Sequence, residues 1–280
     1  MSLLEVRNLS KTYRIGRGRT ATTLAAVSDV SFDLDRGKTL AIVGESGAGK
    51  TTVGRLVLHL ETPDSGQIEL DGQDLVGLGP AEMRAQRKNM QVVLQDPYRS
   101  FDPRIPIGRS VAEPLKVLGV LKDDSERMQT AQSVLERVGL GAHFMRRYPR
   151  ELSGGQLQRV SIARALAVNP KLVILDEAVA SLDVSIRAQV LNLLLDLQDE
   201  LGVSYLFISH DLNVVRFFAD DVVVMRRGSI VESGPTAQLF AEPADDYTRK
   251  LLAAIPTLGR KQVQSAAEKG SAPATAATTT

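Results

Sequence analysis

Cysteine and tryptophan are both absent from the 280 residues of this chain. The lack of cysteine excludes disulfides, thiol catalysis and zinc or iron–sulfur centres held by cysteine. Aromatic residues make up only 4% of the chain, so a broad surface for stacking nucleic-acid bases is not expected. Lys and Arg number 34 and Asp and Glu number 33, and the net charge of +1 gives no sign of a nucleic-acid-binding protein.

Long apolar runs are missing as well. No stretch approaches the roughly 18 residues that a membrane-spanning helix requires. Residues 1–13 lack the apolar core and the cleavage site of a secretory signal, so we expect a soluble intracellular protein that could dock on a membrane partner. Hydrophobic residues make up 43% and charged residues 24%, an ordinary globular composition whose length allows one large or two modest domains.

Short apolar or alternating segments recur along the chain and predict β-strands. These segments are residues 3–7, 30–34, 39–43, 67–70, 90–94, 172–175, 205–208 and 222–225. Between the first two, residues 14–23 are rich in Arg, Gly and Thr and predict an exposed loop. Apolar periodicity predicts helices at 51–60 and 185–201. Strands that alternate with helices favour an α/β fold with a mainly parallel sheet.

Two regions depart from this alternation. Between residues 107 and 148, Leu and Val recur at three- and four-residue spacing with few strand signals, which predicts a mostly helical insertion. Residues 261–280 are Ala, Thr, Ser and Lys with almost no large apolar side chains, so they cannot offset the entropy of ordering. We therefore predict a disordered tail there.

The segment GESGAGKT at 44–51 matches the pattern G-x-x-x-x-G-K-[S/T] in full. Glycines let backbone N–H groups point inward toward phosphates, and the helix that follows adds the partial positive charge of its N-terminus. We expect Lys50 to reach the β- and γ-phosphates and the Thr51 hydroxyl to ligate Mg²⁺. A chance glycine-rich turn is the alternative, but a buried strand precedes this loop and a helix follows it. The predicted nucleotide contacts are Gly44, Ser46, Gly47, Gly49, Lys50, Thr51 and Thr52.

A second strand, at 172–175, runs directly into Asp176 and Glu177. In a parallel sheet, ligands bind at the carboxyl ends of the strands. Asp176 is therefore placed to hold Mg²⁺, directly or through water, and Glu177 to orient and polarise an attacking water. Solvated acids at a strand end are the alternative. The presence of the phosphate loop favours the catalytic interpretation.

The sequence LSGGQ at 152–156 resembles the signature of ATP-binding cassette (ABC) ATPases. Other elements of that family appear in order along residues 3–256. Tyr13 resembles the aromatic residue that stacks on adenine, and Gln95 resembles the Q-loop glutamine. The segment SLD at 181–183 resembles the D-loop, and His210 resembles the switch histidine.

The resemblance implies a P-loop NTPase core of ABC type with an N-terminal antiparallel β subdomain. It places one ATPase domain at residues 1–256, with a helical subdomain inserted at about 96–160, and a C-terminal extension at 257–280. ATP and Mg²⁺ are the implied cofactors, with Gln95 a further metal ligand beside Thr51 and Asp176. His210 joins Glu177 and Lys50 as an implied catalytic residue.

The resemblance also implies partners. Two such ATPases, here expected to be different homologous chains, pair head to tail, so that one chain contacts the ATP held by Lys50 of the other. The signature residues that make this contact are Ser153, Gly154, Gly155 and Gln156. Two membrane permease subunits bind the ATPase pair, and an extracytoplasmic solute-binding protein acts through them. No nucleic-acid partner is implied. The expected location is the cytoplasmic face of the plasma (inner) membrane, held there through the permeases.

Each motif alone has a simpler interpretation. Ser153 with two glycines can be only a helix N-cap with a flexible turn. His210 after an apolar strand can be a packed core histidine, and Tyr13 an ordinary aromatic at a strand edge. These alternatives stay open at the level of sequence.

Three segments narrow the resemblance to the ATPases of oligopeptide, dipeptide and nickel importers. They are QDPYRSFDPR at 95–104, LNLL at 191–194 and YTRKLLAAIP at 247–256. The leading hypothesis is an importer ATPase for peptides or similar small solutes. A non-transport ABC ATPase acting on nucleic acid or ribosomes is the alternative, although such proteins usually carry two cassettes or a long coiled coil. A regulatory subunit without turnover is a third hypothesis, but it would be expected to lack Glu177 or His210.

Overall fold

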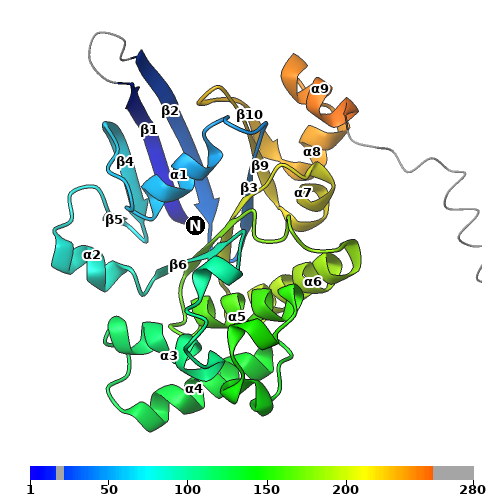
Figure 1. Cartoon of the computed structure of the whole chain (residues 1–280). Coiled ribbons are helices and arrows are strands. Elements are labelled where there is room, and N and C mark those ends of the chain that lie inside the picture. Colours follow the sequence, from blue (N-terminus) through cyan, green and yellow to red (C-terminus); the bar gives the residue numbers. More distant parts are fainter. Residues whose placement is uncertain (17–21, 255–280) are drawn as a thin grey trace, which may run out of the picture.

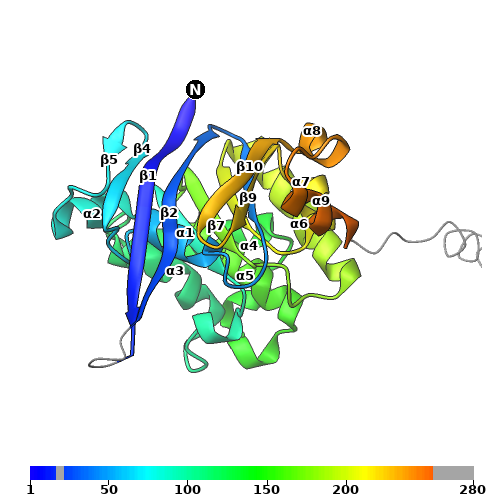
Figure 2. The same cartoon turned by 90° about the horizontal axis from the view of Figure 1, so that it is seen from above.

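The computed structural model describes residues 1–16 and 22–254. It contains a four-stranded antiparallel sheet of order β2-β1-β4-β5 and a six-stranded sheet of order β10-β9-β3-β8-β7-β6. Figure 1 shows the antiparallel sheet at the upper left, and Figure 2 shows the same arrangement from above. The predicted α/β class is thus confirmed, including the antiparallel β part near the N-terminus. The predicted tail at 261–280 lies outside the described residues.

The antiparallel sheet is longer than its sequence pattern indicates. Its strands are β1 (Ser2–Ile15), β2 (Thr22–Asp35), β4 (Ser65–Leu70) and β5 (Gln73–Asp74). Arg14 pairs with Thr23, so the ends of the loop predicted at 14–23 are strand, and residues 17–21 lie outside the described chain. The β-branched Thr22 and Thr23 suit a strand, which lets the ladder continue past the apolar alternation.

Five of the six strands in the larger sheet run parallel. The strands are β3 (Thr39–Val43), β6 (Met90–Leu94), β7 (Leu172–Asp176), β8 (Ser204–Ile208), β9 (Asp221–Arg226) and β10 (Ser229–Pro235). Only β10 is antiparallel, paired with β9. All five residues of β3 and of β8 are buried, as expected for central parallel strands. The carboxyl ends of β3, β7 and β8 therefore meet at one edge of the sheet.

The six-stranded sheet separates two hydrophobic cores. Leu40 and Ile42 of β3 face a core shared with the antiparallel sheet and α1, while Ala41 and Val43 face a core shared with the later helices. The helices are α1 (Lys50–Val57), α2 (Pro80–Gln86), α3 (Ile107–Val117), α4 (Asp124–Arg137), α5 (Gly154–Leu166), α6 (Val184–Leu201), α7 (Leu212–Phe218), α8 (Thr236–Ala241) and α9 (Asp246–Ala253). The helix predicted at 51–60 ends earlier, because His59 adopts a positive φ of 49°.

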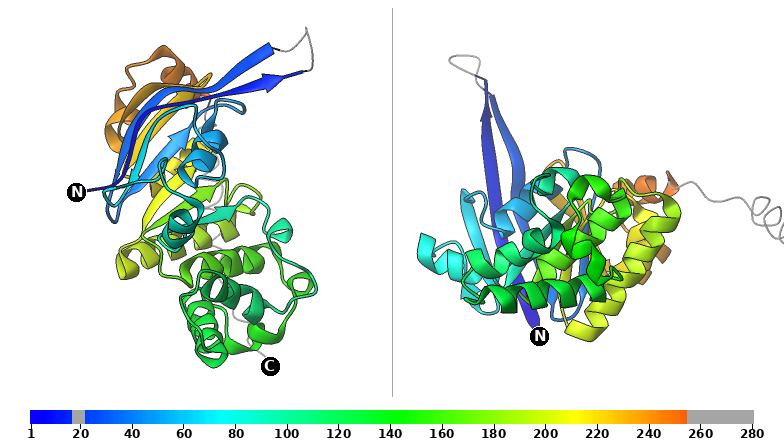
Figure 3. Two further views of the ribbon diagram at one scale, coloured as in Figure 1. Left: turned by 90° about the vertical axis from the view of Figure 1, so that its left-hand side faces the viewer. Right: turned by 60° about the horizontal axis from the view of Figure 1, so that its bottom comes forward.

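Helices α3, α4 and α5 gather at one end of the molecule, at the bottom of Figure 1 and of the left view of Figure 3. Short 3-10 turns complete this region: η2 (Tyr98–Ser100), η3 (Ala142–Arg146) and η4 (Pro149–Glu151). A helical subdomain between β6 and β7, predicted from the Leu and Val spacing, is therefore confirmed. Among the described helices, none combines the length and the apolar character needed to cross a membrane.

Candidate functional site

The phosphate loop at 44–49 connects β3 to α1 and requires glycine at two positions. Gly44 has φ +148°, and a Cβ there would lie 2.2 Å from the Met225 carbonyl oxygen. Gly49 has φ +103°, and a Cβ there would lie 2.2 Å from the Ala26 carbonyl oxygen. The loop is therefore confined between β9 and β2, where no larger residue fits. Within the same loop Ser46 and Gly47 are exposed.

Lys50 is 5% exposed, and its Nζ donates to the carbonyl oxygens of Gly44 and Glu45, each at 2.9 Å. Burial lowers the pKa of Lys50, while the carboxylates of Glu177 and Asp176 act against this shift. The amine is thus held at the mouth of the loop, in a desolvated position where an anionic group would compensate its charge.

Thr51 and Asp176 approach each other from α1 and from the end of β7. The Thr51 Oγ1 donates to Asp176 Oδ1 at 3.3 Å. Burial raises the pKa of Asp176, and the Thr51 hydrogen bond partly opposes the rise. Within residues 1–16 and 22–254, no group of three or more His, Asp or Glu side chains forms a metal cage. Mg²⁺ fits this pair of oxygens nevertheless, because it is commonly held by one or two protein ligands together with phosphates and water.

Glu177, the residue after Asp176, contacts His210. His210 Nδ1 lies 3.2 Å from Glu177 Oε1, and the two side chains are 53% and 22% exposed respectively. The alternative of a packed core histidine is therefore wrong for His210. Glu177 has a left-handed φ of +50°. Its backbone N–H donates to the Ile208 carbonyl oxygen at 2.9 Å, and this hydrogen bond helps to hold the conformation. A left-handed conformation is uncommon for a non-glycine residue.

Gln95 lies just after β6, and its side chain is exposed. Its carbonyl oxygen accepts a hydrogen bond from Ser181 Oγ at 3.3 Å, which links it to the predicted D-loop segment. In the described part of the chain, no hydrogen bond joins the Gln95 side chain to Thr51 or Asp176. The structure thus brings its backbone, rather than its amide group, toward the other predicted site residues.

Ser153 is the N-cap of α5 in a capping box. Its Oγ accepts from Gln156 N at 3.3 Å, and Gln156 Oε1 accepts from Ser153 N at 3.0 Å. The N-cap interpretation of this serine is thus correct as local structure. The box satisfies the N–H groups of Ser153 and Gln156, while helix geometry leaves those of Gly154 and Gly155 without an intrahelical acceptor. A Cβ on Gly155 would lie 2.5 Å from Ile186 Cγ2, so glycine lets α5 approach α6 closely.

Tyr13 lies on β1, opposite Leu24 of β2, and is partly buried. Its hydroxyl donates to Glu61, which follows α1. Burial, and then the hydrogen bond to Glu61, raise the pKa of Tyr13, while a hydrogen bond with Thr52 of α1 opposes the shift. The predicted adenine contact and Thr52 are therefore neighbours beside the first helix.

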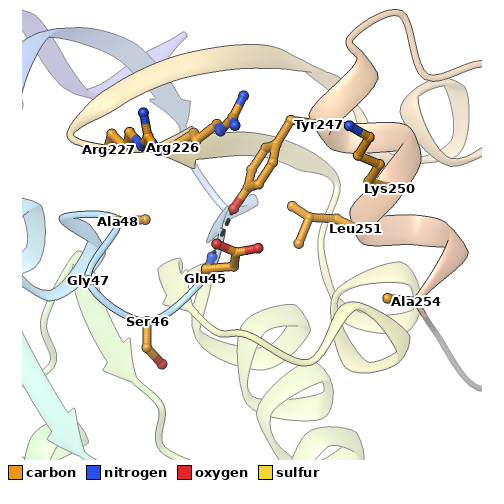
Figure 4. Close-up of a pocket in the computed structure, with 10 residues that line it drawn as sticks. All are labelled: Glu45, Ser46, Gly47, Ala48, Arg226, Arg227, Tyr247, Lys250, Leu251 and Ala254. Atoms are coloured by element: carbon orange, nitrogen blue, oxygen red, sulfur yellow. Dashed lines mark hydrogen bonds between the residues drawn. The ribbon is translucent and has the colours of Figure 1, made fainter.

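Two contacts involve residues that the sequence patterns did not assign to the site. Arg187 Nη1 donates to Asp211 Oδ2 at 2.7 Å, and Arg187 Nη2 donates to the Leu182 carbonyl oxygen at 3.1 Å. This arginine connects the 181–183 turn to the residue after His210. Tyr247 contacts Glu45 in the phosphate loop (Figure 4). No spacing in the sequence signals either contact, because both join distant segments.

Family profiles match two parts of the sequence. The family described as "ABC transporter" matches residues 27–180. The family described as "Oligopeptide/dipeptide transporter, C-terminal region" matches residues 231–280.

Curated proteins of known name are similar over most of this chain. The oligopeptide transport ATP-binding protein OppD of Mycobacterium tuberculosis is 48% identical over 258 residues, covering 91% of this chain and 42% of that protein. The glutathione import ATP-binding protein GsiA of Escherichia coli is 51% identical over 257 residues, covering 91% of this chain and 41% of that protein. The chain thus spans about two fifths of the length of these relatives.

Solved structures share the fold. The ATP-binding cassette MJ0796, in a dimeric post-hydrolysis state bound to ADP and Pi, superposes with a TM-score of 0.74 at 28% identity, covering 83% of this chain and 98% of that chain. The protein cbiO1 from Clostridium perfringens, part of the ABC transporter complex cbiONQ, superposes with a TM-score of 0.76 at 26% identity. That match covers 95% of this chain and 99% of the other.

Proposed function

The chain belongs to the ABC transporter family, and we propose on that basis that it is the ATP-binding and ATP-hydrolysing subunit of a membrane importer for peptides or similar small solutes. The names of its relatives, which transport oligopeptides or import glutathione, support a peptide-like solute. The domain that carries this activity spans residues 1–256, with the helical subdomain inserted at about 96–160 and an extension at 257–280.

One observation carries the proposal: reactive groups from three neighbouring strand ends converge. Lys50 follows β3 through the phosphate loop, Asp176 ends β7 with Glu177 directly after it, and His210 follows β8. Phosphoryl transfer requires charge neutralisation and a positioned water rather than covalent chemistry from the protein. These side chains supply both requirements at one edge of the sheet.

The residues divide the work as follows. Lys50 binds the β- and γ-phosphates of ATP, together with backbone N–H groups of the loop. Thr51 and Asp176 would hold Mg²⁺, with Gln95 as a further ligand, and the metal would supply charge neutralisation at the phosphates. Glu177 orients the attacking water and accepts its proton, while His210, 3.2 Å away, positions that carboxylate.

A second ATPase completes the site from outside, in a head-to-tail pair with a different, homologous chain. Gly154 and Gly155 present N–H groups that their own helix leaves free, beside the Ser153 hydroxyl, which suits an anion held by another chain. Val184, directly after the 181–183 turn, is 80% exposed, so its side chain is accessible to such a partner. ATP bound between the chains then holds the pair closed, and hydrolysis lets it open.

Membrane permease subunits dock at the junction of the sheet and the helical subdomain. A groove of about 420 Å³ opens there between β6, α3 and α5. Leu60 and Val117 line it and are 56% and 50% exposed, so apolar surface is available to a partner. Residues 96–104 lie in the same subdomain and form the other part of the docking surface. The chain then sits at the cytoplasmic face of the plasma (inner) membrane, and a solute-binding protein acts on it only through the permeases.

Copurification and turnover test this proposal. The chain, expressed with the permease subunits of a peptide importer, should be recovered in the membrane fraction and should hydrolyse ATP faster when solute and binding protein are added. Recovery with ribosomes or nucleic acid instead would favour the non-transport alternative. Recovery with permeases but without ATP turnover would favour a regulatory subunit.

A further inference from the structure

The segment YTRKLLAAIP at 247–256 has no role in the site described above, yet its first residue reaches the phosphate loop. Tyr247 is 7% exposed and lies in the first turn of α9. Its Oη accepts a hydrogen bond from the backbone N–H of Glu45 at 3.2 Å, across a sequence separation of 202 residues. Figure 4 shows the ring extending from α9 to the loop with this bond dashed.

The ring occupies a fixed position. It lines a pocket of about 330 Å³ formed by the phosphate loop, the β9–β10 turn and α9 (Figure 4). The Arg226 guanidinium lies 4.8 Å from the ring centroid, within the range of a cation–π interaction. The aromatic ring is therefore held by its face as well as by its hydroxyl.

The start of α9 is anchored independently of the loop. Asp245 caps the helix by accepting from the N–H groups of Tyr247 and Thr248 at 2.7 and 3.4 Å. The Glu232 carboxylate on β10 accepts from the N–H groups of Ala244 and Asp245 at 2.8 and 3.1 Å. Four hydrogen bonds from backbone N–H groups to these two carboxylates thus fix the start of α9, so the Tyr247 hydroxyl is presented by a rigid element.

The contact bears directly on Lys50. The N–H of Glu45 and the carbonyl of Gly44 belong to one planar trans peptide unit, so they point in opposite directions. The carbonyl side of this unit accepts from Lys50 Nζ at 2.9 Å, and the N–H side donates to Tyr247. Fixing one side of a rigid plane fixes the other.

We propose that Tyr247 is a positioning residue for nucleotide binding: it sets the orientation of the Gly44–Glu45 peptide and thereby the place of the Lys50 amine. This role rests on the proposed function of the phosphate loop as the ATP site. The substitution Tyr247→Phe keeps the ring and the Arg226 contact and removes only the hydroxyl. Glu45 then loses its hydrogen-bond acceptor, and the loop spends part of its time in orientations that do not bind ATP.

The test compares full-length wild type, Tyr247→Phe and the control Tyr148→Phe, whose ring is partly exposed and lies far along the chain from α9. The dissociation constant of a fluorescent trinitrophenyl-ATP should rise about fivefold in Tyr247→Phe, the effect expected for one hydrogen bond, and stay unchanged in the control. The Glu45 amide should exchange with solvent faster, and the thermal midpoint should fall by no more than the few degrees that one hydrogen bond accounts for. In the assembled complex KM should rise while kcat stays within about twofold, because Glu177 is untouched.

Unchanged affinity or unchanged Glu45 exchange in Tyr247→Phe would overturn the inference, as would an equal loss in Tyr148→Phe or a large fall in the thermal midpoint. Failure of the proposed function looks different. In that case wild type itself would bind no nucleotide, and Glu45 exchange in the two proteins would still decide whether Tyr247 holds the peptide.

Discussion

Replacing Glu177 with glutamine separates nucleotide binding from hydrolysis. The backbone there is held in a left-handed conformation by the N–H of Glu177 and the Ile208 carbonyl oxygen, and both remain in the variant. Glutamine has the same length, so it can still contact His210. What disappears is a carboxylate able to accept a proton from water.

The size of the effect follows from that loss. General-base catalysis contributes about 10²–10⁴-fold, so turnover in Glu177→Gln should fall at least about a hundredfold, or about 3 kcal/mol in activation free energy. Lys50, Thr51 and Asp176 stay in place, so ATP and Mg²⁺ should bind as in wild type. The closed pair of ATPases should then persist, because the ATP that holds it is no longer consumed.

The assay has two parts. Phosphate release by the assembled complex measures turnover, and size-exclusion chromatography with and without ATP measures association with the partner ATPase. Glu242→Gln is the matched control, because Glu242 is exposed and follows α8, away from the phosphate loop. Turnover within a few-fold of wild type would show that Glu177 is not the general base. Loss of ATP binding would instead make it a structural residue or a primary metal ligand.

Three further predictions concern binding, stability and docking. Lys50→Ala should abolish hydrolysis and weaken ATP binding strongly. Lys50→Met should be equally impaired, because it keeps most of the side-chain length but lacks the charge. Near-normal turnover in either variant, measured by phosphate release, would contradict the assignment of the phosphate loop. Burial raises the pKa of Asp176, so its ionised form destabilises the native state above that pKa. Asp176→Asn should therefore raise the thermal midpoint at pH 7 and reduce Mg²⁺-dependent turnover. The gain in stability should decrease as the pH falls through the raised pKa toward 3.8. A lower thermal midpoint than wild type at pH 7 would contradict this prediction. Residues 96–104 and the groove around Leu60 and Val117 should gain hydrogen-exchange protection when permeases bind, and protection confined to β9 and β10 would contradict the docking surface.

Short sequence patterns are sufficient to predict a structural element and its functional residues when both lie in the same segment. The apolar residues before Asp176 predict a strand, and the glycines before Lys50 predict a phosphate-binding loop. Because parallel strands place their carboxyl ends at one edge of the sheet, the two segments are also predicted to lie close together. The N-cap at Ser153 is likewise local, because the capping box around it spans only the four residues 153–156. Local features of this kind can be predicted from the sequence alone.

Other parts depend on packing between distant segments. The His210 side chain is 53% exposed, whereas the apolar strand before it favours burial. The need for glycine at 155 comes from Ile186 on another helix. The extension of β1 and β2 past their apolar alternation reflects pairing between the two strands, which single-strand periodicity does not register.

The confinement of the phosphate loop between the carbonyl oxygens of Met225 and Ala26 has a consequence for protein engineering. The conformation of residues 44–51 depends on packing against other segments, because β9 contacts the loop on one side and β2 on the other. Grafting those residues onto another strand–turn–helix would transfer the lysine and the hydroxyl without the contacts from β9 and β2 that fix the loop backbone. The same reasoning makes Ala26 and Met225, which bear no reactive group, part of the minimal unit that any transplant would have to include.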